Sequence, residues 1–322
     1  MMMRKKGGVY QGILVFGKDE FSDLKPLYRE ETKMNSRKQI ILAVSLIVAL
    51  VLTGVAYAET TLEKCKRQGY VTVAFANEKP AAYADSHGKL TGRAVEVCRV
   101  VFTRIGIPEM QGMLTQWGSL IPSLLAKRVD AVTADMYIKP ARCKKVAFSE
   151  PISKYGEALA VKKGNPKKLH SLEDIAANPQ AKLAVISGGA VEYEYARAVG
   201  VPDDRILRVP DPTSGMAALQ AGRVDAFCHP RQTIIDLVKV SKDPNLEVAS
   251  PYTDPVIDGK VVVDYGATAF RQEDTAIREA FNRELKKFIA SGEMTALYKE
   301  WGVGEEDVPE DHINTKDICA GK

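Results

Sequence analysis

LLAKRVDA at residues 124–131 recurs 95 residues later as LQAGRVDA at residues 219–226. In each copy, apolar residues at helical spacing lead through a short basic break into an apolar run that is typical of a strand. A helix followed by a strand is the repeating unit of parallel α/β sheets. Two copies of this unit predict an α/β fold with two lobes. Because ligands of open α/β sheets bind beyond the carboxyl ends of the strands, the residues after each copy are the first candidates for a site.

The two copies lead into different chemistry. Asp135, Tyr137 and Arg142 follow the first copy, whereas the segment 228–230, Cys-His-Pro, follows the second. A guanidinium presents a planar fork of donors that matches a carboxylate, and Arg142 lies just past the predicted strand 130–134. We therefore expect Arg142 to bind an anionic group, the alternative being a surface arginine on a charged turn.

An export signal precedes the folded part of the chain. Residues 40–55 are almost entirely apolar, Arg37 and Lys38 come before them, and Ala56-Tyr57-Ala58 follows. This pattern predicts a cleavable secretory signal peptide at 34–58, with an uncleaved membrane anchor as the alternative. Residues 1–33 are polar and without periodicity, which indicates either a wrongly assigned start, with translation beginning at Met34, or a disordered extension.

The charge of the remaining chain narrows the classes of partner. The whole chain carries a formal charge of +4, which becomes zero once residues 1–58 are set aside. Nucleic acids and anionic membranes are bound by clustered Lys and Arg, so we expect neither as a partner. Residues 59–322 are enough for two domains. We predict a first lobe from 59–155 and 264–322, a second lobe from 156–263, and a hinge where the chain crosses twice.

Five cysteines are consistent with export to an oxidising compartment. Cys65 and Cys319 lie near the two ends of the mature chain, and because domain termini are often close together we predict a disulfide between them. Cys98 and Cys143 are a possible second pair, which leaves Cys228 as a small buried apolar residue. The Cys and His spacings match no zinc motif, and no cofactor is predicted.

The periodicity of apolar residues predicts the principal helices and strands. Ser171 is expected to cap a short helix, with Asp174 three residues further on. Strands are predicted over 69–75, 130–134, 158–161, 182–186, 261–263 and 265–270, and helices over 94–105, 120–126, 191–198, 274–290 and 294–301.

Two further motifs carry a resemblance to a known family. IKPAR at 138–142 with FSEP at 148–151 resembles the signature of the polar amino-acid family of solute-binding proteins that serve bacterial ABC importers. WGSLIP at 117–122 and SGEMTALYKEW at 291–301 extend the match over essentially the whole mature chain. Within the family, FANE at 75–78 is most similar to ectoine and hydroxyectoine binders, as are KKGNPK at 162–167 and AVGVPDD at 198–204.

The resemblance implies a type II periplasmic binding protein fold, with two α/β lobes joined by a two-strand hinge. It further implies a monomer in the periplasm that has a membrane permease as its partner. Arg142 would take the ligand carboxylate, Trp117 and Tyr137 would be aromatic walls for a delocalised cyclic amidinium, and Glu78 would supply its counter-charge. Backbone N–H groups at Gly189 and Ala190, at a helix start, would hold the same carboxylate from the other lobe. The implied ligand-binding set is Glu78, Tyr83, Trp117, Asp135, Tyr137, Arg142, Gly189 and Ala190.

This chain departs from the family pattern at two places. Amino-acid binders usually carry an Asp after the second Asp-Ala pair, whereas this chain has Phe-Cys-His-Pro at 227–230, which argues against an ordinary α-amino acid. Ectoine binders tend to have an aromatic residue just after Glu78, but here Ala81 and Ala82 occupy that stretch and Tyr83 is the nearest candidate. His229 is expected either to hydrogen-bond in the pocket or to be structural.

The leading hypothesis is a periplasmic protein that closes over ectoine, hydroxyectoine or a related zwitterion and delivers it to an ABC permease. A polar amino-acid binder of the same family is the alternative. A periplasmic dehydratase acting on a cyclic carboxylate, with Glu78 as an acid, is less favoured because the sequence contains no nucleophile elbow, catalytic Cys/His pair or metal motif. We therefore expect a binding protein rather than an enzyme.

Overall fold

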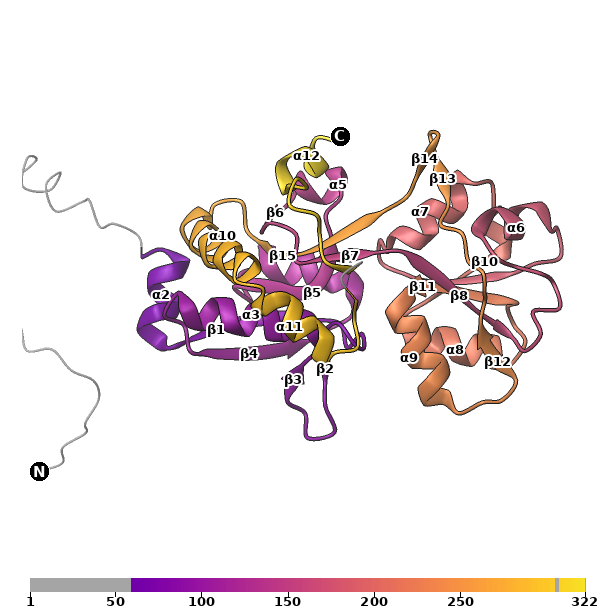
Figure 1. The fold of residues 1–322 in the computed structure, drawn as a ribbon, viewed down its shortest axis with the longest axis horizontal. Coiled ribbons are helices and arrows are strands. Elements are labelled where there is room, and N and C mark those ends of the chain that lie inside the picture. The colour runs from indigo at the N-terminus through magenta and orange to yellow at the C-terminus, as the bar shows by residue number, and fades with distance from the viewer. Residues whose placement is uncertain (1–58, 305–306, 322) are drawn as a thin grey trace, which may run out of the picture. The chain divides into compact units, whose positions relative to one another are not determined.

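A computed structural model describes residues 59–304 and 307–321 of the chain (Figure 1). The predicted signal peptide and the first 33 residues lie outside this described part. Within it, no helix is both long and apolar enough to cross a membrane.

The first lobe is built on a sheet with the strand order β4-β1-β5-β15-β6, and β7 also pairs with β15. β1 runs parallel to β4 and β5, while β15 is antiparallel to β5. Phe102, Phe270 and Phe281 form an aromatic cluster in its core. The strands are β1 (Tyr70–Phe75), β4 (Glu109–Leu114), β5 (Ala131–Tyr137), β6 (Ala147–Phe148), β7 (Ser153–Tyr155) and β15 (Asp264–Phe270). The principal helices are α2 (Thr61–Gln68), α3 (Arg93–Arg104), α4 (Leu120–Leu125), α10 (Thr275–Ala290) and α11 (Glu293–Glu300).

The second lobe has its own sheet, with the order β10-β9-β11-β8-β12, and two separate buried apolar clusters. β9 is parallel to β10 and β11, and β8 is antiparallel to β11. The strands are β8 (Glu157–Lys162), β9 (Leu183–Ile186), β10 (Ile206–Val209), β11 (Ala226–Pro230) and β12 (Leu246–Val248). The helices are α6 (Leu172–Ala177), α7 (Val191–Ala198), α8 (Pro212–Gln220) and α9 (Arg231–Ser241), which Figure 1 shows around this sheet.

Short elements complete the described chain. They are the hairpins β2 (Tyr83–Ala84) with β3 (Leu90–Thr91) and β13 (Val256–Ile257) with β14 (Lys260–Val261), the 3-10 turns η1 (Trp117–Ser119) and η2 (Asp203–Arg205), and the helices α5 (Pro140–Cys143) and α12 (Thr315–Cys319). Ser171 caps α6 as predicted, because its side chain accepts a hydrogen bond from the backbone N–H of Asp174.

The repeated sequence stretch forms the same element pair in each lobe. The first copy ends α4 and enters β5, and the second ends α8 and enters β11. β5 is longer than predicted: residues 131–137 are all buried, so Asp135 and Tyr137 lie within the strand rather than after it. β15 pairs alongside this extension, with Gly266 opposite Tyr137.

Asp135 sits in a crowded, buried polar cluster. Its backbone has a φ of 52°, which a non-glycine residue rarely adopts. One carboxylate oxygen accepts a hydrogen bond of 2.5 Å from Ser153 Oγ, and the other pairs with Arg93 Nη2 at 3.0 Å. A Cβ on Gly266 would collide with this carboxylate and with Ser153, so only glycine fits at that position of β15.

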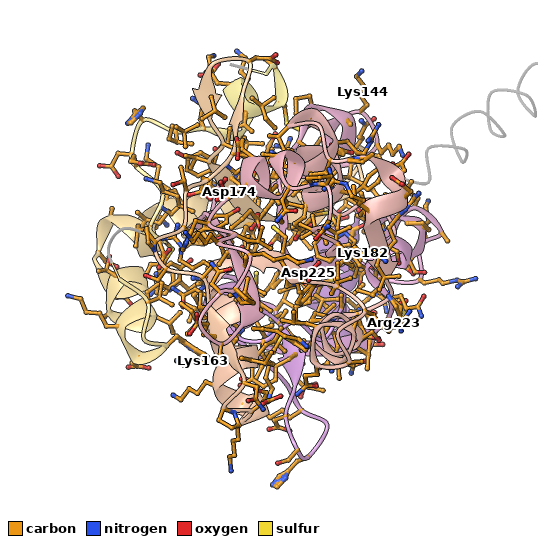
Figure 2. All side chains as sticks on the ribbon, turned by 90° about the vertical axis from the view of Figure 1, so that its right-hand side faces the viewer. Lys144, Lys163, Asp174, Lys182, Arg223 and Asp225 are labelled. Atoms are coloured by element: carbon orange, nitrogen blue, oxygen red, sulfur yellow. A yellow bond between two sulfur atoms is a disulfide. The ribbon has the colours of Figure 1, made fainter. Side chains whose placement is uncertain are left out.

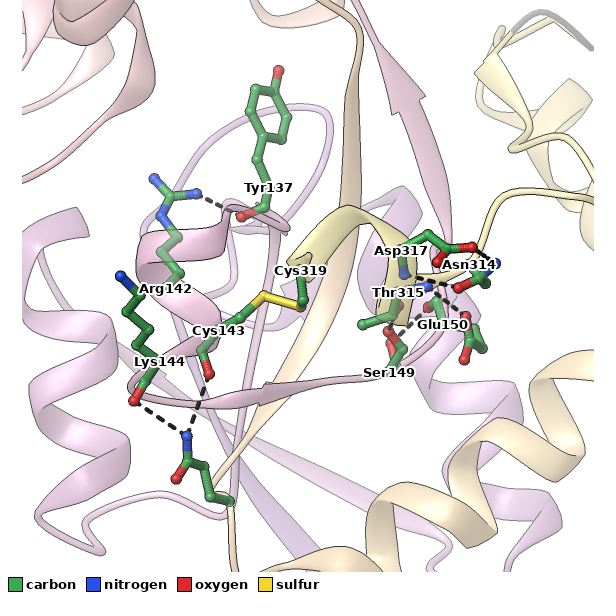
Figure 3. The surroundings of a disulfide bond; sticks show 11 residues. Tyr137, Arg142, Cys143, Lys144, Ser149, Glu150, Asn314, Thr315, Asp317 and Cys319 are labelled. Atoms are coloured by element: carbon green, nitrogen blue, oxygen red, sulfur yellow. Dashed lines mark hydrogen bonds between the residues drawn. A yellow bond between two sulfur atoms is a disulfide. The ribbon is translucent and has the colours of Figure 1, made fainter. Parts of the chain in front are cut away.

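The disulfide joins Cys143 to Cys319, with a Cα–Cα separation of 5.7 Å (Figure 3). The predicted Cys65–Cys319 pair is therefore wrong, and so is the Cys98–Cys143 pair. Cys65 and Cys98 are both buried and unpaired, the first on α2 and the second with its Sγ 3.0 Å from Thr268 Oγ1. Cys228 is buried and free, as predicted.

The physical reason for this pairing is the short helix α12, which the sequence patterns did not predict. α12 packs against α5 instead of returning to the N-terminal helix α2. Thr315 Oγ1 donates to the carbonyl of Ser149 at 2.6 Å, and Thr315 N–H donates to the Glu150 carboxylate at 2.9 Å (Figure 3). These bonds place Cys319 beside Cys143, the residue after Arg142.

Charged side chains of both signs share the surface of the second lobe, where Figure 2 labels Lys163, Lys182, Arg223 and Asp225. Asp225 pairs with Lys167 at 2.8 Å, and Lys163 pairs with Glu247 at 3.1 Å. Positive and negative side chains therefore alternate in these ion pairs and do not form a patch of one sign there.

Replacing both disulfide cysteines, C143S/C319S, should lower the free energy of unfolding by about 2–5 kcal/mol, because the bond closes a long loop in the unfolded chain. Thermal unfolding with and without dithiothreitol measures the effect. Reductant should lower the melting temperature of the wild type and leave the double variant unchanged. A wild type that is insensitive to reductant would contradict the expectation.

Candidate functional site

One cavity receives side chains from both lobes and encloses about 510 Å³ of empty space, counted with the part open to solvent. Its first-lobe wall includes Glu78, Trp117, Asp135, Tyr137 and Arg142. Its second-lobe wall includes Ala190, Val191, Glu192, His229 and Thr233. Pro80, Ala81 and Gln232 also line the cavity.

Arg142 lines the cavity from α5, and the proline at the start of this helix fixes the direction in which it leaves β5. Its Nη1 donates to the Tyr137 carbonyl at 2.8 Å, and its Nη2 donates to the Gly189 carbonyl of the second lobe at 2.9 Å. The guanidinium also lies over the Trp117 ring, 5.5 Å from its centroid. Two of its five donors are thus bonded to carbonyls, which leaves a held, oriented fork for an anion.

Aromatic side chains form the walls next to Arg142. Trp117 lies in η1, directly before α4, and is partly exposed. Tyr137 ends β5, and its ring packs against Tyr155 with the centroids 5.2 Å apart. The Tyr137 hydroxyl donates to Glu157 at 3.3 Å, so the ring is held from below. Flat aromatic faces of this kind favour a delocalised, poorly hydrated cation.

Glu78 and Glu192 bring carboxylate groups to the cavity wall. Glu78 follows β1, where its backbone exchanges two hydrogen bonds with Ala82, and only 9% of its surface is exposed. Its Oε2 lies 3.8 Å from His229 Nε2, and His229 Nδ1 lies 3.0 Å from Glu192 Oε1. A carboxylate of the first lobe, an imidazole and a carboxylate of the second lobe therefore form a chain across the cavity.

Burial and the neighbouring charges shift the pKa values of Glu78 and His229 upward. The pKa of Glu78 is raised to about 7, mainly by burial; His229 and Arg142 oppose this shift, and the neighbouring Glu192 adds to it. For His229, burial lowers the pKa, but the two carboxylates outweigh it, and the net shift of the pKa is upward. The cluster therefore holds protons near neutral pH when no ligand cation is present.

Six of the eight predicted site residues line this cavity: Glu78, Trp117, Asp135, Tyr137, Arg142 and Ala190. Asp135 does so while bonded to Arg93 and Ser153, so the cluster beneath the cavity already uses its carboxylate. The structure places Gly189 behind Arg142, where its carbonyl accepts a bond from the guanidinium. Tyr83 lies outside the cavity walls, because the β2–β3 hairpin turns its ring against Trp301, with centroids 6.5 Å apart.

Sequence reasoning missed Glu192 as part of the site. The sequence patterns predict the helix 191–198 but do not show that Glu192 lies on its buried side together with Ala196. The signal was present in the sequence: Glu192 follows Val191 directly, at the start of the helix that leaves the glycine-rich turn 187–190.

The backbones of the two lobes touch at a pair of glycines beside the cavity. A Cβ on Gly118 would lie 3.1 Å from the Cα of Gly188, and a Cβ on Gly188 would lie 2.8 Å from the Cα of Gly118. Gly188 also has a φ of +82°, a conformation that favours glycine. The lobes can approach this closely only because neither residue has a side chain.

The model of the bacterial extracellular solute-binding proteins, family 3, matches residues 71–304. The chain belongs to this family. It is also 39% identical over 283 residues to the "probable amino-acid ABC transporter periplasmic-binding protein y4tE" of Sinorhizobium fredii, a match that covers 87% of this chain and 93% of that protein. The L-cystine-binding protein TcyJ of Escherichia coli is 26% identical, over 81% of this chain and 92% of its own.

Solved structures with the same type II periplasmic binding protein fold are also similar to this chain. The crystal structure of EhuB in complex with hydroxyectoine is 40% identical to this chain, with a TM-score of 0.73, and covers 81% of this chain and 98% of that one. The ancestral amino acid-binding protein AncCDT-1, described as a precursor of cyclohexadienyl dehydratase, is 25% identical with a TM-score of 0.64, over 75% of this chain and 99% of its own. The protein is a solute-binding protein of the ABC importer class.

The raised pKa of Glu78 predicts a pH dependence of stability. Because its pKa is about 7 in the folded protein against 4.5 as a model value, the folded state binds this proton more tightly, and stability is lost as the pH rises from 4.5 through 7. E78Q should remove this loss and be more stable than the wild type at pH 8 by up to ~3 kcal/mol.

Urea unfolding of ligand-free wild type and E78Q between pH 4.5 and 8 measures the difference, and E194Q, at an exposed glutamate of α7, is the control. Parallel pH curves for wild type and E78Q would show that Glu78 does not hold this proton.

Proposed function

We propose that this protein captures a small zwitterion of the ectoine and hydroxyectoine class between its lobes in the periplasm and delivers it to an ABC permease. One observation carries the proposal: one aromatic-walled cavity is lined both by the guanidinium of Arg142 and by the buried carboxyl group of Glu78. A compact molecule with a carboxylate and a separate delocalised cation matches both groups at once.

The proposed ligand-binding residues are Glu78, Trp117, Tyr137, Arg142 and Ala190. Asp135 would act as a support beneath the cavity and Gly189 as a carbonyl that orients Arg142, whereas Tyr83, whose ring packs against Trp301, does not belong to the proposed set. EhuB, 40% identical and crystallised with hydroxyectoine, supports this class of ligand. Ala81 offers no aromatic face to the cavity, and Tyr155, which lines the cavity and packs against Tyr137, is the further aromatic face that we propose in place of Tyr83.

The proposed organisation of the chain follows from this function. We propose a first lobe of residues 59–155 and 264–322, a second lobe of 156–263, and export by the segment 34–58. The periplasmic relatives and the extracellular family support export. We further propose that the protein acts as a monomer, binds no nucleic acid and catalyses no reaction.

A polar amino acid is the second candidate ligand, and Glu192 favours it. Although residues 227–230 contain no carboxylate, Glu192 enters the cavity from the second lobe, where it could receive an α-ammonium group. Several relatives are named as amino-acid binders.

Isothermal titration of the exported protein, freed of copurifying solute, should show heat with ectoine and hydroxyectoine. R142A should weaken binding by about 30-fold or more, because it leaves the ligand carboxylate buried without its partner. K144A, at an exposed lysine two residues away, is the matched control and should bind as the wild type does. If the protein binds polar amino acids and no ectoine, the proposed ligand class is wrong. If it converts a cyclic carboxylate, the proposed function as a binding protein is wrong.

The glycine contact between the lobes gives a separate prediction. G118V should weaken ligand binding by about tenfold, because its side chain must displace Gly188 when the lobes meet, whereas each lobe remains intact. Q116V on the same loop is the control. Titration calorimetry and the melting temperature of the ligand-free protein test this, and an unchanged affinity in G118V would mean that ligand capture does not need this approach.

A further inference from the structure

His229 is a buried imidazole at the cavity wall whose role the motifs leave open. It lies on β11 with 3% of its surface exposed, and its ring stacks on Phe227 at an angle of 16°. Nδ1 is 3.0 Å from Glu192 Oε1, while Nε2 has no hydrogen-bond partner within the described residues. Phe227 thus packs against the ring and Glu192 contacts Nδ1, which leaves Nε2 without a partner in a residue that lines the cavity.

The bond to Glu192 determines what the free nitrogen can do. The raised pKa of His229 favours the imidazolium while no ligand cation is bound. A ligand cation at this wall disfavours that second positive charge, and in the neutral imidazole whose hydrogen lies on Nδ1, toward Glu192, Nε2 is an acceptor. Glu192 Oε2 also has no hydrogen-bond partner among the described residues. Glu78 Oε2 lies 3.8 Å from Nε2. His229 Nε2 and Glu78 Oε2 are therefore neighbouring acceptor atoms, and Glu192 lines the same cavity.

Hydrogen-bond acceptors in a cavity favour ligands that bring N–H or O–H donors to them. A buried acceptor that is left unpaired costs free energy, so a ligand that brings N–H groups to this end is favoured twice, by charge and by hydrogen bonds. A cation whose nitrogen is fully alkylated brings the charge but no donor. Sites built to hydrogen-bond a ligand N–H or O–H discriminate strongly against analogues that lack it.

We infer that His229, positioned by Glu192, is a ligand-recognition residue of the second lobe, whose Nε2 accepts an N–H from the cationic end of the zwitterion beside Glu78. This inference rests on the proposed function and deepens it. The protein selects zwitterions with N–H-bearing cations, such as cyclic amidinium groups, over zwitterions with quaternary ammonium groups.

Titration calorimetry with two zwitterions tests the inference: ectoine, whose cyclic amidinium carries N–H groups, and proline betaine, whose ring nitrogen is fully methylated. The wild type should prefer ectoine by about 100-fold or more. H229F keeps the aromatic stack but removes the acceptor, and it should lower this preference by about tenfold or more through weaker ectoine binding.

H229Q restores an acceptor near the position of Nε2 and should recover part of the preference, which a merely structural role would not do. H170F makes the same change at a histidine of the second lobe that does not line this cavity, and it should leave the preference unchanged. If H229F does not fold, the inference is tested by the ratio of the affinities for ectoine and proline betaine in the wild type and in H229Q.

The possible failures are distinguishable. A wild type that binds neither ectoine nor any other zwitterion overturns the proposed function and this inference together. A wild type that binds both test ligands equally, or a preference that is the same in wild type and H229F, overturns the inference alone and leaves the proposed function standing.

Discussion

The site depends on the burial of charged groups that the protein itself pairs only in part. Removing a charge from water is costly unless it is paired and hydrogen-bonded. In this cavity the guanidinium of Arg142 is bonded to two carbonyls, and the carboxylate of Glu192 is bonded to His229 on one side only. Glu78 responds to the same cost by holding a proton near neutral pH. A zwitterion supplies the missing charges in the right order, so the groups that destabilise the empty protein are the ones that would bind the ligand.

The rest of the first lobe holds these groups in place. The buried pair of Asp135 and Arg93 lies at the extended end of β5, which carries Tyr137. The disulfide ties α12 to α5, one residue beyond Arg142. Arg142 is thus constrained on both sides within one lobe, yet one of its carbonyl partners, Gly189, belongs to the other lobe. The approach of the lobes therefore completes the anion site and brings Glu192 and His229 opposite Glu78.

Sequence patterns predicted the features that depend on the local spacing of residues. They missed those that depend on where a segment packs or on which way a side chain points. The repeated helix-strand unit gave two lobes, and the position of Arg142 after a strand placed it at the site. The disulfide could not be predicted, because α12 is a five-residue helix whose position rests on contacts with residues far away in sequence. Tyr83 lies near Glu78 in sequence, but a hairpin turns its ring away. Glu192 was missed because a charged residue beside an apolar one is normally assigned to the exposed face of a helix.

The two copies of the repeated stretch lead to different chemistry in the two lobes. In the first lobe the strand of the repeat, β5, continues to Tyr137 and leads into the helix that carries Arg142, which makes this edge suited to an anion. In the second lobe the corresponding strand, β11, stops at Pro230, and its last buried side chain is His229. The carboxylate of this edge comes instead from α7, through Glu192. A guanidinium and acceptor groups therefore face each other across one small cavity, an arrangement that favours a molecule with separated charges over a simple anion or cation.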